Sequence, residues 1–123
     1  MRAKILNASA GSGKTYQLAY KYVRDVVEQP SIYRHILAVT FTNKATEEMK
    51  SRILKEIHLL ASGGESSYLE NLCRELDMDA ATVRRRAAEV RSKILHDYSR
   101  FTVLTIDTFF QRILRAFIKE LGI

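Results

Sequence analysis

Cysteine, proline and tryptophan are nearly absent from this chain of 123 residues, which has one cysteine, one proline and no tryptophan. A disulfide framework within the chain is excluded because there is no second cysteine. Cys73 lies among Leu69, Leu72 and Leu76 at helical spacing, so we interpret it as a buried apolar side chain rather than a catalytic thiol. No apolar run approaches membrane-spanning length, and no cleavable signal precedes the first apolar run. We therefore expect a cytoplasmic protein with no membrane partner.

Acidic residues are fewer than basic ones: 14 Asp and Glu stand against 20 Lys and Arg, a net charge of +6. This balance favours a polyanionic partner. The three histidines, His35, His58 and His96, lack metal-ligand spacing to cysteine or carboxylates. Hydrophobic residues make up 46% of the chain, which is enough for a single core. The composition indicates one globular domain with a basic surface.

Short apolar runs alternate with longer helical patterns, which is typical of an α/β fold with a parallel sheet flanked by helices. The runs predict strands at about 3–6, 36–39 and 101–105. The spacing of apolar residues predicts helices over about 14–28, from 43 to the glycines at 63 and 64, and over 68–76, 80–97 and 107–121. We expect Asn43 and Asp107 to cap the helices that they begin.

The segment Ala8–Thr15 reads ASAGSGKT and lies between the first strand and the first helix. Gly11 and Gly13 allow the tight bend that turns backbone N–H groups toward phosphate oxygens, and the following helix adds its positive N-terminal dipole. Lys14 can reach the β- and γ-phosphates, and the Thr15 hydroxyl can ligate the magnesium ion between them. The general pattern has Gly where this chain has Ala8. The segment predicts a site for ATP or GTP made by Ala10, Gly11, Ser12, Gly13, Lys14 and Thr15.

A second polar segment, Thr40–Lys44, follows the second strand. Parallel sheets bind ligands at the carboxyl ends of their strands, so this segment is expected near the phosphate loop. Phe41 can stack on a base, while Thr40, Thr42, Asn43 and Lys44 can hold sugar and phosphate. The alternative is that Phe41 is a core aromatic residue and the polar residues are helix caps. The local sequence leaves both interpretations open.

The sequence TFTNKATEEMKSRI at 40–53 resembles motif Ia of the UvrD/Rep-type superfamily 1 DNA helicases, a segment that contacts single-stranded DNA in that family. The sequence TIDTF at 105–109 is similar to the motif that follows, which also lies at the DNA-binding face. With the phosphate loop, three motifs stand in family order. The form ASAGSGKT and the ending IDTFFQRILR look most like the RecB and AddA branch, the helicase-nucleases that process double-strand DNA ends.

This resemblance implies that residues 1–123 are the first part of the N-terminal RecA-like lobe of a P-loop NTPase, with a helical insertion at about 63–99. It implies a motor in DNA repair and recombination that uses ATP and magnesium to move along single-stranded DNA and separate the duplex. The implied DNA contacts are Thr40, Phe41, Thr42, Asn43, Lys44, Thr105 and Asp107. The implied partners are DNA, the remainder of the helicase chain with its second RecA-like lobe, and a partner helicase-nuclease subunit. No catalytic residue is assigned within these residues, because the family's water-activating Asp-Glu pair comes later, so this part alone is expected to be inactive.

Two other functions fit parts of the sequence. A small P-loop kinase would use Asp107 as a magnesium ligand at the end of the third strand and Arg84–Arg86 as a phosphate-closing lid. It would leave TFTNKATEEMK without a role, and no acceptor site is evident. A non-catalytic module that binds nucleotide or nucleic acid is the other alternative.

Overall fold

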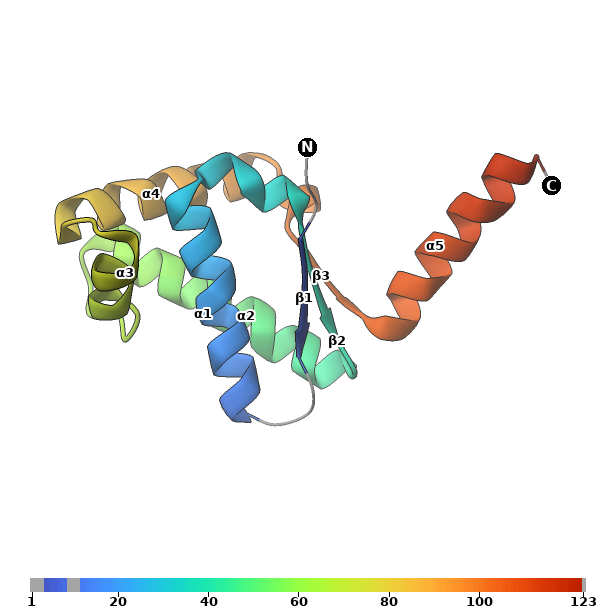
Figure 1. Cartoon of the computed structure of the whole chain (residues 1–123), viewed down its shortest axis with the longest axis horizontal. Coiled ribbons are helices and arrows are strands. Elements are labelled where there is room, and N and C mark those ends of the chain that lie inside the picture. Colours follow the sequence, from blue (N-terminus) through green and yellow to red (C-terminus); the bar gives the residue numbers. More distant parts are fainter. Residues whose placement is uncertain (1–3, 9–11, 123) are drawn as a thin grey trace.

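The computed structural model describes the backbone of residues 4–8 and 12–122 and the side chains of residues 15–122. Within these residues, three strands and five α-helices follow one another in α/β order, with two short 3-10 helices between them (Figure 1). The strands are β1 (Lys4–Ala8), β2 (Ile36–Thr40) and β3 (Thr102–Thr105). The helices are α1 (Ser12–Glu28), α2 (Asn43–Ser62), α3 (Leu69–Leu76), α4 (Ala80–His96) and α5 (Ile106–Leu121), and the 3-10 helices are η1 (Pro30–His35) and η2 (Tyr98–Arg100).

The described strands form one parallel sheet in the order β1-β2-β3. Ala8 pairs with Thr40, and Thr40 pairs with Thr105. The last residues of all three strands are therefore in register at one edge of the sheet. The parallel arrangement that the alternating pattern predicts is confirmed for these strands.

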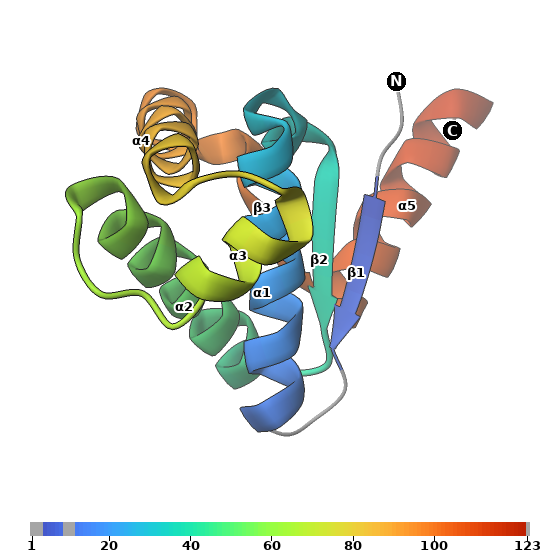
Figure 2. The same ribbon diagram turned by 60° about the vertical axis from the view of Figure 1, so that its left-hand side comes forward.

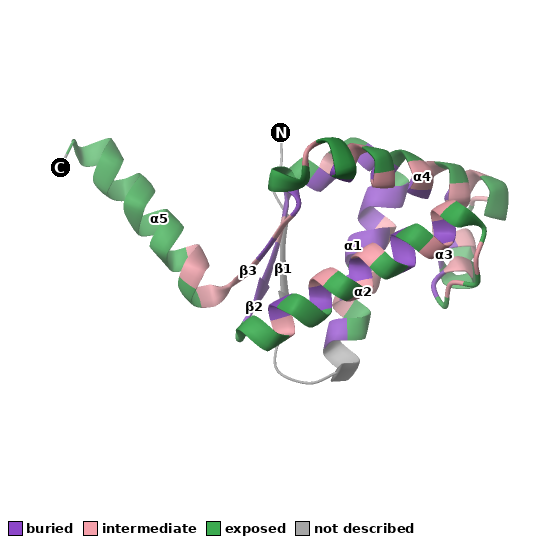
Figure 3. Ribbon diagram, turned by 180° about the vertical axis from the view of Figure 1, so that it is seen from behind, coloured by how far each residue is buried: buried purple, intermediate pink, exposed green. Residues whose placement is uncertain are grey.

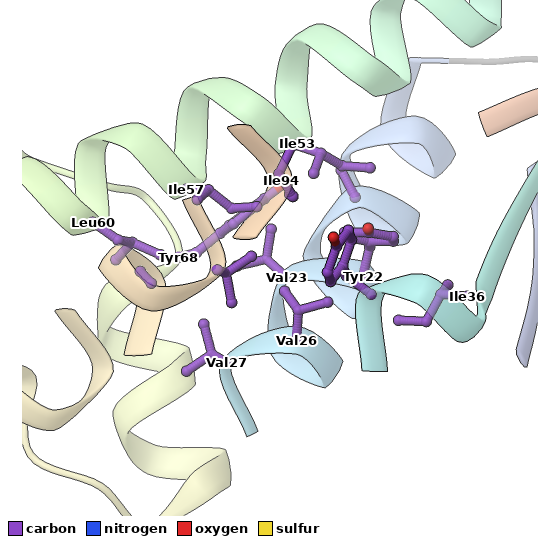
Figure 4. Close-up of a cluster of buried hydrophobic side chains, with 14 of the residues drawn as sticks. Tyr22, Val23, Val26, Val27, Ile36, Ile53, Ile57, Leu60, Tyr68 and Ile94 are labelled. Carbon is purple, nitrogen blue, oxygen red and sulfur yellow. The ribbon is translucent and has the colours of Figure 1, made fainter. Parts of the chain in front are cut away.

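The helices α1 and α2 lie against one face of the sheet, and α4 packs on both of them (Figures 1 and 2). Their apolar stripes meet in a core of fully buried side chains around Tyr22, Val23, Ile53, Ile57 and Leu60 (Figure 4). The predicted inward residues of α4 are all buried in this core, and they are Val83, Ala87, Val90 and Ile94. Burial of these helix faces removes much apolar surface from water and is the main source of stability.

The helix α5 extends away from this core (Figures 1 and 3). Its apolar side chains stay accessible to solvent: Phe110 is 59% exposed, Phe117 59% and Leu121 57%. The sequence predicts an amphipathic helix here, and that is confirmed. No other described element covers its apolar face, because α5 touches only the ends of β2 and β3 to any extent. An exposed apolar face of this kind is typical of an interaction surface.

Residues 63–99 form α3 and α4, which cover the outer sides of α1 and α2 (Figure 2). Arg84 donates to the carbonyl oxygens of Leu59 at 3.3 Å, Leu60 at 3.1 Å and Gly64 at 3.0 Å. Arg86 donates to the carbonyl oxygen of Glu28 at 2.6 Å. Both guanidinium groups therefore serve the carbonyl ends of α2 and α1, where a cation opposes the negative end of the helix dipole.

Two predicted helix caps are wrong by one or two residues. The N-cap of α2 is Thr42, whose hydroxyl accepts a hydrogen bond from the backbone N–H of Ala45 at 3.0 Å, and Asn43 is the first helical residue. The N-cap of α5 is Thr105, which accepts from the N–H of Thr108 at 3.2 Å. Threonine, asparagine and aspartate all cap helices, so the local sequence did not separate them. Within the described residues, no helix combines the length and apolar character needed to cross a membrane.

Candidate nucleotide and DNA site

The carboxyl ends of the three strands lie side by side, and each leads into one of the three sequence motifs. The predicted phosphate loop follows β1 in the chain, the Thr40–Lys44 segment begins at the last residue of β2, and the Thr105–Asp107 segment begins at the last residue of β3. The pairing of Ala8 with Thr40 and of Thr40 with Thr105 holds these ends in register. This is the edge at which open α/β sheets bind their ligands.

The predicted phosphate-binding residues fall partly outside the described residues. Ala10 and Gly11 are not among them, while the backbone of Ser12, Gly13 and Lys14 forms the first turn of α1. Thr15 follows in the same turn and is 7% exposed. The first backbone N–H groups of a helix lack partners within the helix, so this turn offers donors and a positive dipole to an anion.

A pocket of about 420 Å³ opens beside Thr15, between the start of α1 and the middle of α2. Besides Thr15 it is lined by Tyr16, Glu48, Ser51, Arg52 and Lys55. Two cations against one carboxylate give the lining an excess of positive charge. A pocket of this charge, next to a helix N-terminus, suits part of an anionic ligand.

Thr40 is 1% exposed and lies inside the junction between β2 and α2. Its hydroxyl oxygen is 2.6 Å from that of Thr46, and it donates to the carbonyl oxygen of Leu104 at 3.4 Å. Thr46 also donates to the carbonyl oxygen of Thr42 at 3.1 Å. The structure therefore gives Thr40 bonds that fix the turn between the strand and the helix.

Phe41 follows Thr40 and is 54% exposed. Thr42, Asn43 and Lys44 are exposed as well, so four consecutive side chains face solvent at the sheet edge. The alternative interpretation of Phe41 as a core aromatic residue is wrong, because the turn that Thr40 holds directs it outward. An exposed ring beside polar and cationic groups is the combination that single-stranded nucleic acid binds.

The third motif contributes one accessible and one partly buried residue. Thr105 is half-buried; besides capping α5, its hydroxyl donates to the hydroxyl of Thr108 at 3.0 Å. Asp107 is exposed in the first turn of α5, where a carboxylate is favourable against the helix dipole. Of the predicted DNA contacts, five are accessible, and the two at the strand ends, Thr40 and Thr105, are tied into backbone turns.

Sequence reasoning did not single out Tyr16 and Arg52, which the pocket beside Thr15 brings together. The guanidinium carbon of Arg52 lies 5.3 Å from the centre of the Tyr16 ring. Arg52 is visible in the sequence as the residue one turn after Glu48 on the same helix face. Its contact with Tyr16 joins two helices and has no local sequence signal.

Comparison with known proteins matches the chain to one family over nearly its whole length. The family model of the UvrD/REP helicase N-terminal domain matches residues 2–123. The RecBCD enzyme subunit RecB of Escherichia coli strain K12 is 29% identical over 127 residues, covering 97% of this chain and 11% of that protein. A subunit of the ATP-dependent helicase/nuclease of Lactobacillus helveticus is 30% identical over 110 residues, covering 85% of this chain and 9% of the relative.

The ATP-dependent DNA helicase PcrA of Bacillus subtilis is 47% identical over a shorter stretch of 49 residues, 40% of this chain and 7% of that protein. No solved structure matches the chain. The chain thus spans about a tenth of the length of the curated relatives that it matches. The names of these relatives include two helicases, and the resemblance of the three motifs is confirmed. The chain belongs to the UvrD/REP helicase N-terminal domain family.

Proposed function

We propose that this chain is the ATP-binding first part of an ATP-dependent DNA helicase that moves along single-stranded DNA. The observation that carries the proposal is the in-register edge at which β1, β2 and β3 end, since the predicted phosphate loop follows β1 in the chain and an exposed aromatic segment follows β2. A motor needs nucleotide and DNA sites that are energetically coupled, so that a change at one alters the other. Both candidate sites lie at one edge of a short parallel sheet.

In this proposal the backbone of Ala10–Lys14 and the ammonium group of Lys14 hold the phosphates of ATP. Thr15, in the first turn of α1, would supply a hydroxyl oxygen to the magnesium ion, because magnesium prefers oxygen ligands, while the positive charge of the adjacent pocket lining suits the phosphates that the ion accompanies. Bound magnesium would neutralise the charge that develops on the phosphates during hydrolysis. The P-loop NTPase fold of the complete lobe is part of this proposal.

Single-stranded DNA is proposed to lie across Phe41, Thr42, Asn43, Lys44 and Asp107. The Phe41 ring would stack on a base, and Lys44 would neutralise a phosphate. Thr40 and Thr105 are proposed to act from beneath, by holding the turns that present these side chains. Supporting this division, both strand-end threonines are engaged by neighbouring groups.

We also propose that residues 1–123 form only the first part of the RecA-like lobe, with the insertion at 63–99 as its outer helical layer. The exposed apolar face of α5 supports this, because the rest of the parent chain would cover it. The second lobe and the water-activating carboxylates would come from that remainder, so these residues alone would not turn over ATP.

Two of the relatives are named as a component of the RecBCD enzyme and as a component of a helicase/nuclease. For the parent we therefore propose a nuclease activity in DNA repair, together with a second, partner subunit. Because one of the named relatives is a DNA helicase, we also propose a cytoplasmic location. The kinase alternative is less well supported, because two of the arginines that would close over a phosphate, Arg84 and Arg86, donate hydrogen bonds to helix carbonyl groups.

The test is Lys14→Ala in the parent polypeptide, with ATP turnover and binding of an ATP analogue as readouts. We expect turnover to fall by at least about a hundredfold, because the lysine stabilises the charge on the phosphates more strongly in the transition state than in the ground state. The matched control is Lys21→Ala, an exposed lysine two turns further along α1. Unchanged ATP turnover in the Lys14 variant would refute the assignment of the phosphate loop.

A further inference from the structure

The segment Ser66–Tyr68, between α2 and α3, contacts Tyr16, the residue of α1 that follows Thr15 and the first turn. Tyr68 is fully buried, and its hydroxyl donates a hydrogen bond to the carbonyl oxygen of Tyr16 at 2.8 Å. The two rings meet edge to face, with centres 5.1 Å apart and an interplanar angle of 71°. Side chain and backbone of Tyr16 are therefore both held by one residue of the insertion.

Two further groups hold the Tyr16 side chain. Its hydroxyl donates to the hydroxyl oxygen of Ser67 at 3.1 Å, and Arg52 lies over its ring at 5.3 Å. A cation over an aromatic face is attracted by the ring quadrupole. Tyr16 is thus fixed from α2 on one side and from the Ser66–Tyr68 segment on the other.

The segment is in turn anchored to α2 through a buried carboxylate. Ser66 donates to Oε1 of Glu56 at 2.7 Å and accepts from the backbone N–H of Tyr68 at 3.1 Å. Glu56 is 2% exposed and also lies 3.6 Å from the guanidinium group of Arg52. A carboxylate removed from water holds its partners firmly, since losing one leaves a buried charge uncompensated. The anchor therefore fixes the backbone that carries Tyr68, whose side chain lies in the buried hydrophobic cluster (Figure 4).

We propose that Tyr68 is a positioning residue for nucleotide binding, which sets the place of the first turn of α1 and with it Lys14 and Thr15. This inference rests on the function proposed above and assigns to the insertion a task at the nucleotide site. The physical reason is preorganisation: a phosphate cradle binds well only when its donors already stand in the bound geometry. The carbonyl of Tyr16 lies one residue after Thr15, so a bond to it restrains the turn that carries both ligand-binding side chains.

The hydroxyl of Tyr68 stays a donor over the whole working range of pH. Burial raises the pKa of Tyr68 well above its ordinary value of 10.0. The bond to the Tyr16 carbonyl is therefore intact at any pH used to assay ATP hydrolysis.

The test is Tyr68→Phe in the parent polypeptide, with KM for ATP, kcat and thermal stability measured together. The ring stays in place and only the hydroxyl is lost. We expect KM to rise roughly three- to tenfold, the effect of one neutral hydrogen bond on binding, and kcat to change by less than about twofold. That split separates positioning from a general loss of folded protein, which lowers the apparent kcat and leaves KM unchanged.

The matched control is Tyr33→Phe. Tyr33 lies in η1, just before β2 and away from the carboxyl ends of the strands. It is also fully buried, and its hydroxyl donates to the carbonyl oxygen of Lys93 at 3.1 Å. Its removal should cost similar stability and leave KM within about twofold of the starting protein. An equal rise of KM in both variants, or no rise in the Tyr68 variant, would overturn the inference.

A second variant decides the matter where Tyr68→Phe fails to fold. Ser67 is exposed, so Ser67→Ala removes the partner of the Tyr16 hydroxyl without emptying the core. A rise of KM of roughly two- to threefold supports the inference, and an unchanged KM contradicts it. Lys14→Ala distinguishes a failure of the proposed function from a failure of the role of Tyr68. If Lys14→Ala abolishes nucleotide binding while Tyr68→Phe has no effect, the proposed function stands and only the role of Tyr68 is refuted.

Discussion

Replacing Phe41 by alanine separates a DNA-binding ring from a structural one, because the two roles differ in which free energy they change. Phe41 is 54% exposed in the turn after β2. Burying a phenylalanine fully contributes about 1.5–3 kcal/mol, so truncating a ring that is already more than half exposed should cost about 1 kcal/mol of folding stability or less. A core phenylalanine would cost about 3–5 kcal/mol.

The expected loss lies instead in binding. Stacking of a base on an aromatic ring contributes about 1–3 kcal/mol, so the Kd for single-stranded DNA should rise roughly 5- to 150-fold. The assay is fluorescence anisotropy of a labelled oligothymidylate with the parent polypeptide at one fixed salt concentration, because DNA affinities depend strongly on salt. Thermal unfolding of the same samples gives the stability.

Tyr98→Ala is the matched control. Tyr98 is a 50% exposed aromatic residue in η2, before β3 and so at the opposite end of the strands. Its loss should leave the Kd for DNA unchanged. The reasoning is refuted if Phe41→Ala leaves the Kd unchanged, or if it lowers stability by as much as it lowers affinity.

Two further predictions concern stability. Arg84→Met removes three hydrogen bonds to carbonyl groups at the end of α2, so it should lower the free energy of unfolding in urea by about 1–2 kcal/mol. Arg85→Met, at an exposed position, is the control and should leave that free energy unchanged. Equal effects of the two variants would contradict the capping role of Arg84. Burial and the neighbouring Glu75 raise the pKa of Tyr20 from 10.0 to about 12. Because the pKa of Tyr20 is higher in the folded than in the unfolded protein, the protonated side chain contributes to folding stability. That contribution is complete below pH 10 and is lost as the pH rises to about 12. Circular dichroism across that range should record falling stability, and a constant stability would contradict it.

The sequence predicts those parts of the fold that depend on local pattern. The apolar spacing of Val83, Ala87, Val90 and Ile94 gives the inward face of α4, and Gly63, whose φ is 84°, ends α2 as expected for a glycine C-cap. These features need only neighbouring residues, so a single sequence suffices to find them.

The features that sequence reasoning missed are contacts across long separations. The bond between Tyr68 and Tyr16 joins residues 52 positions apart, and the bonds from Arg84 reach back to the end of α2. No local period marks such a pair, and a run of arginines on a predicted helix more often indicates a solvated face than buried hydrogen bonds. The candidate site shows the same division: the motifs and their shared edge are predictable, whereas the burial of Thr40 and the exposure of Phe41 come from how β2 packs on α2.

The most direct test of the central claim is the ATPase rate of the parent polypeptide titrated with single-stranded DNA, measured beside the 123-residue chain. A helicase motor predicts turnover that rises with DNA in the parent and is absent from the short chain. Turnover that is independent of DNA, or ATP hydrolysis by the short chain alone, would contradict the account and favour a self-contained P-loop enzyme.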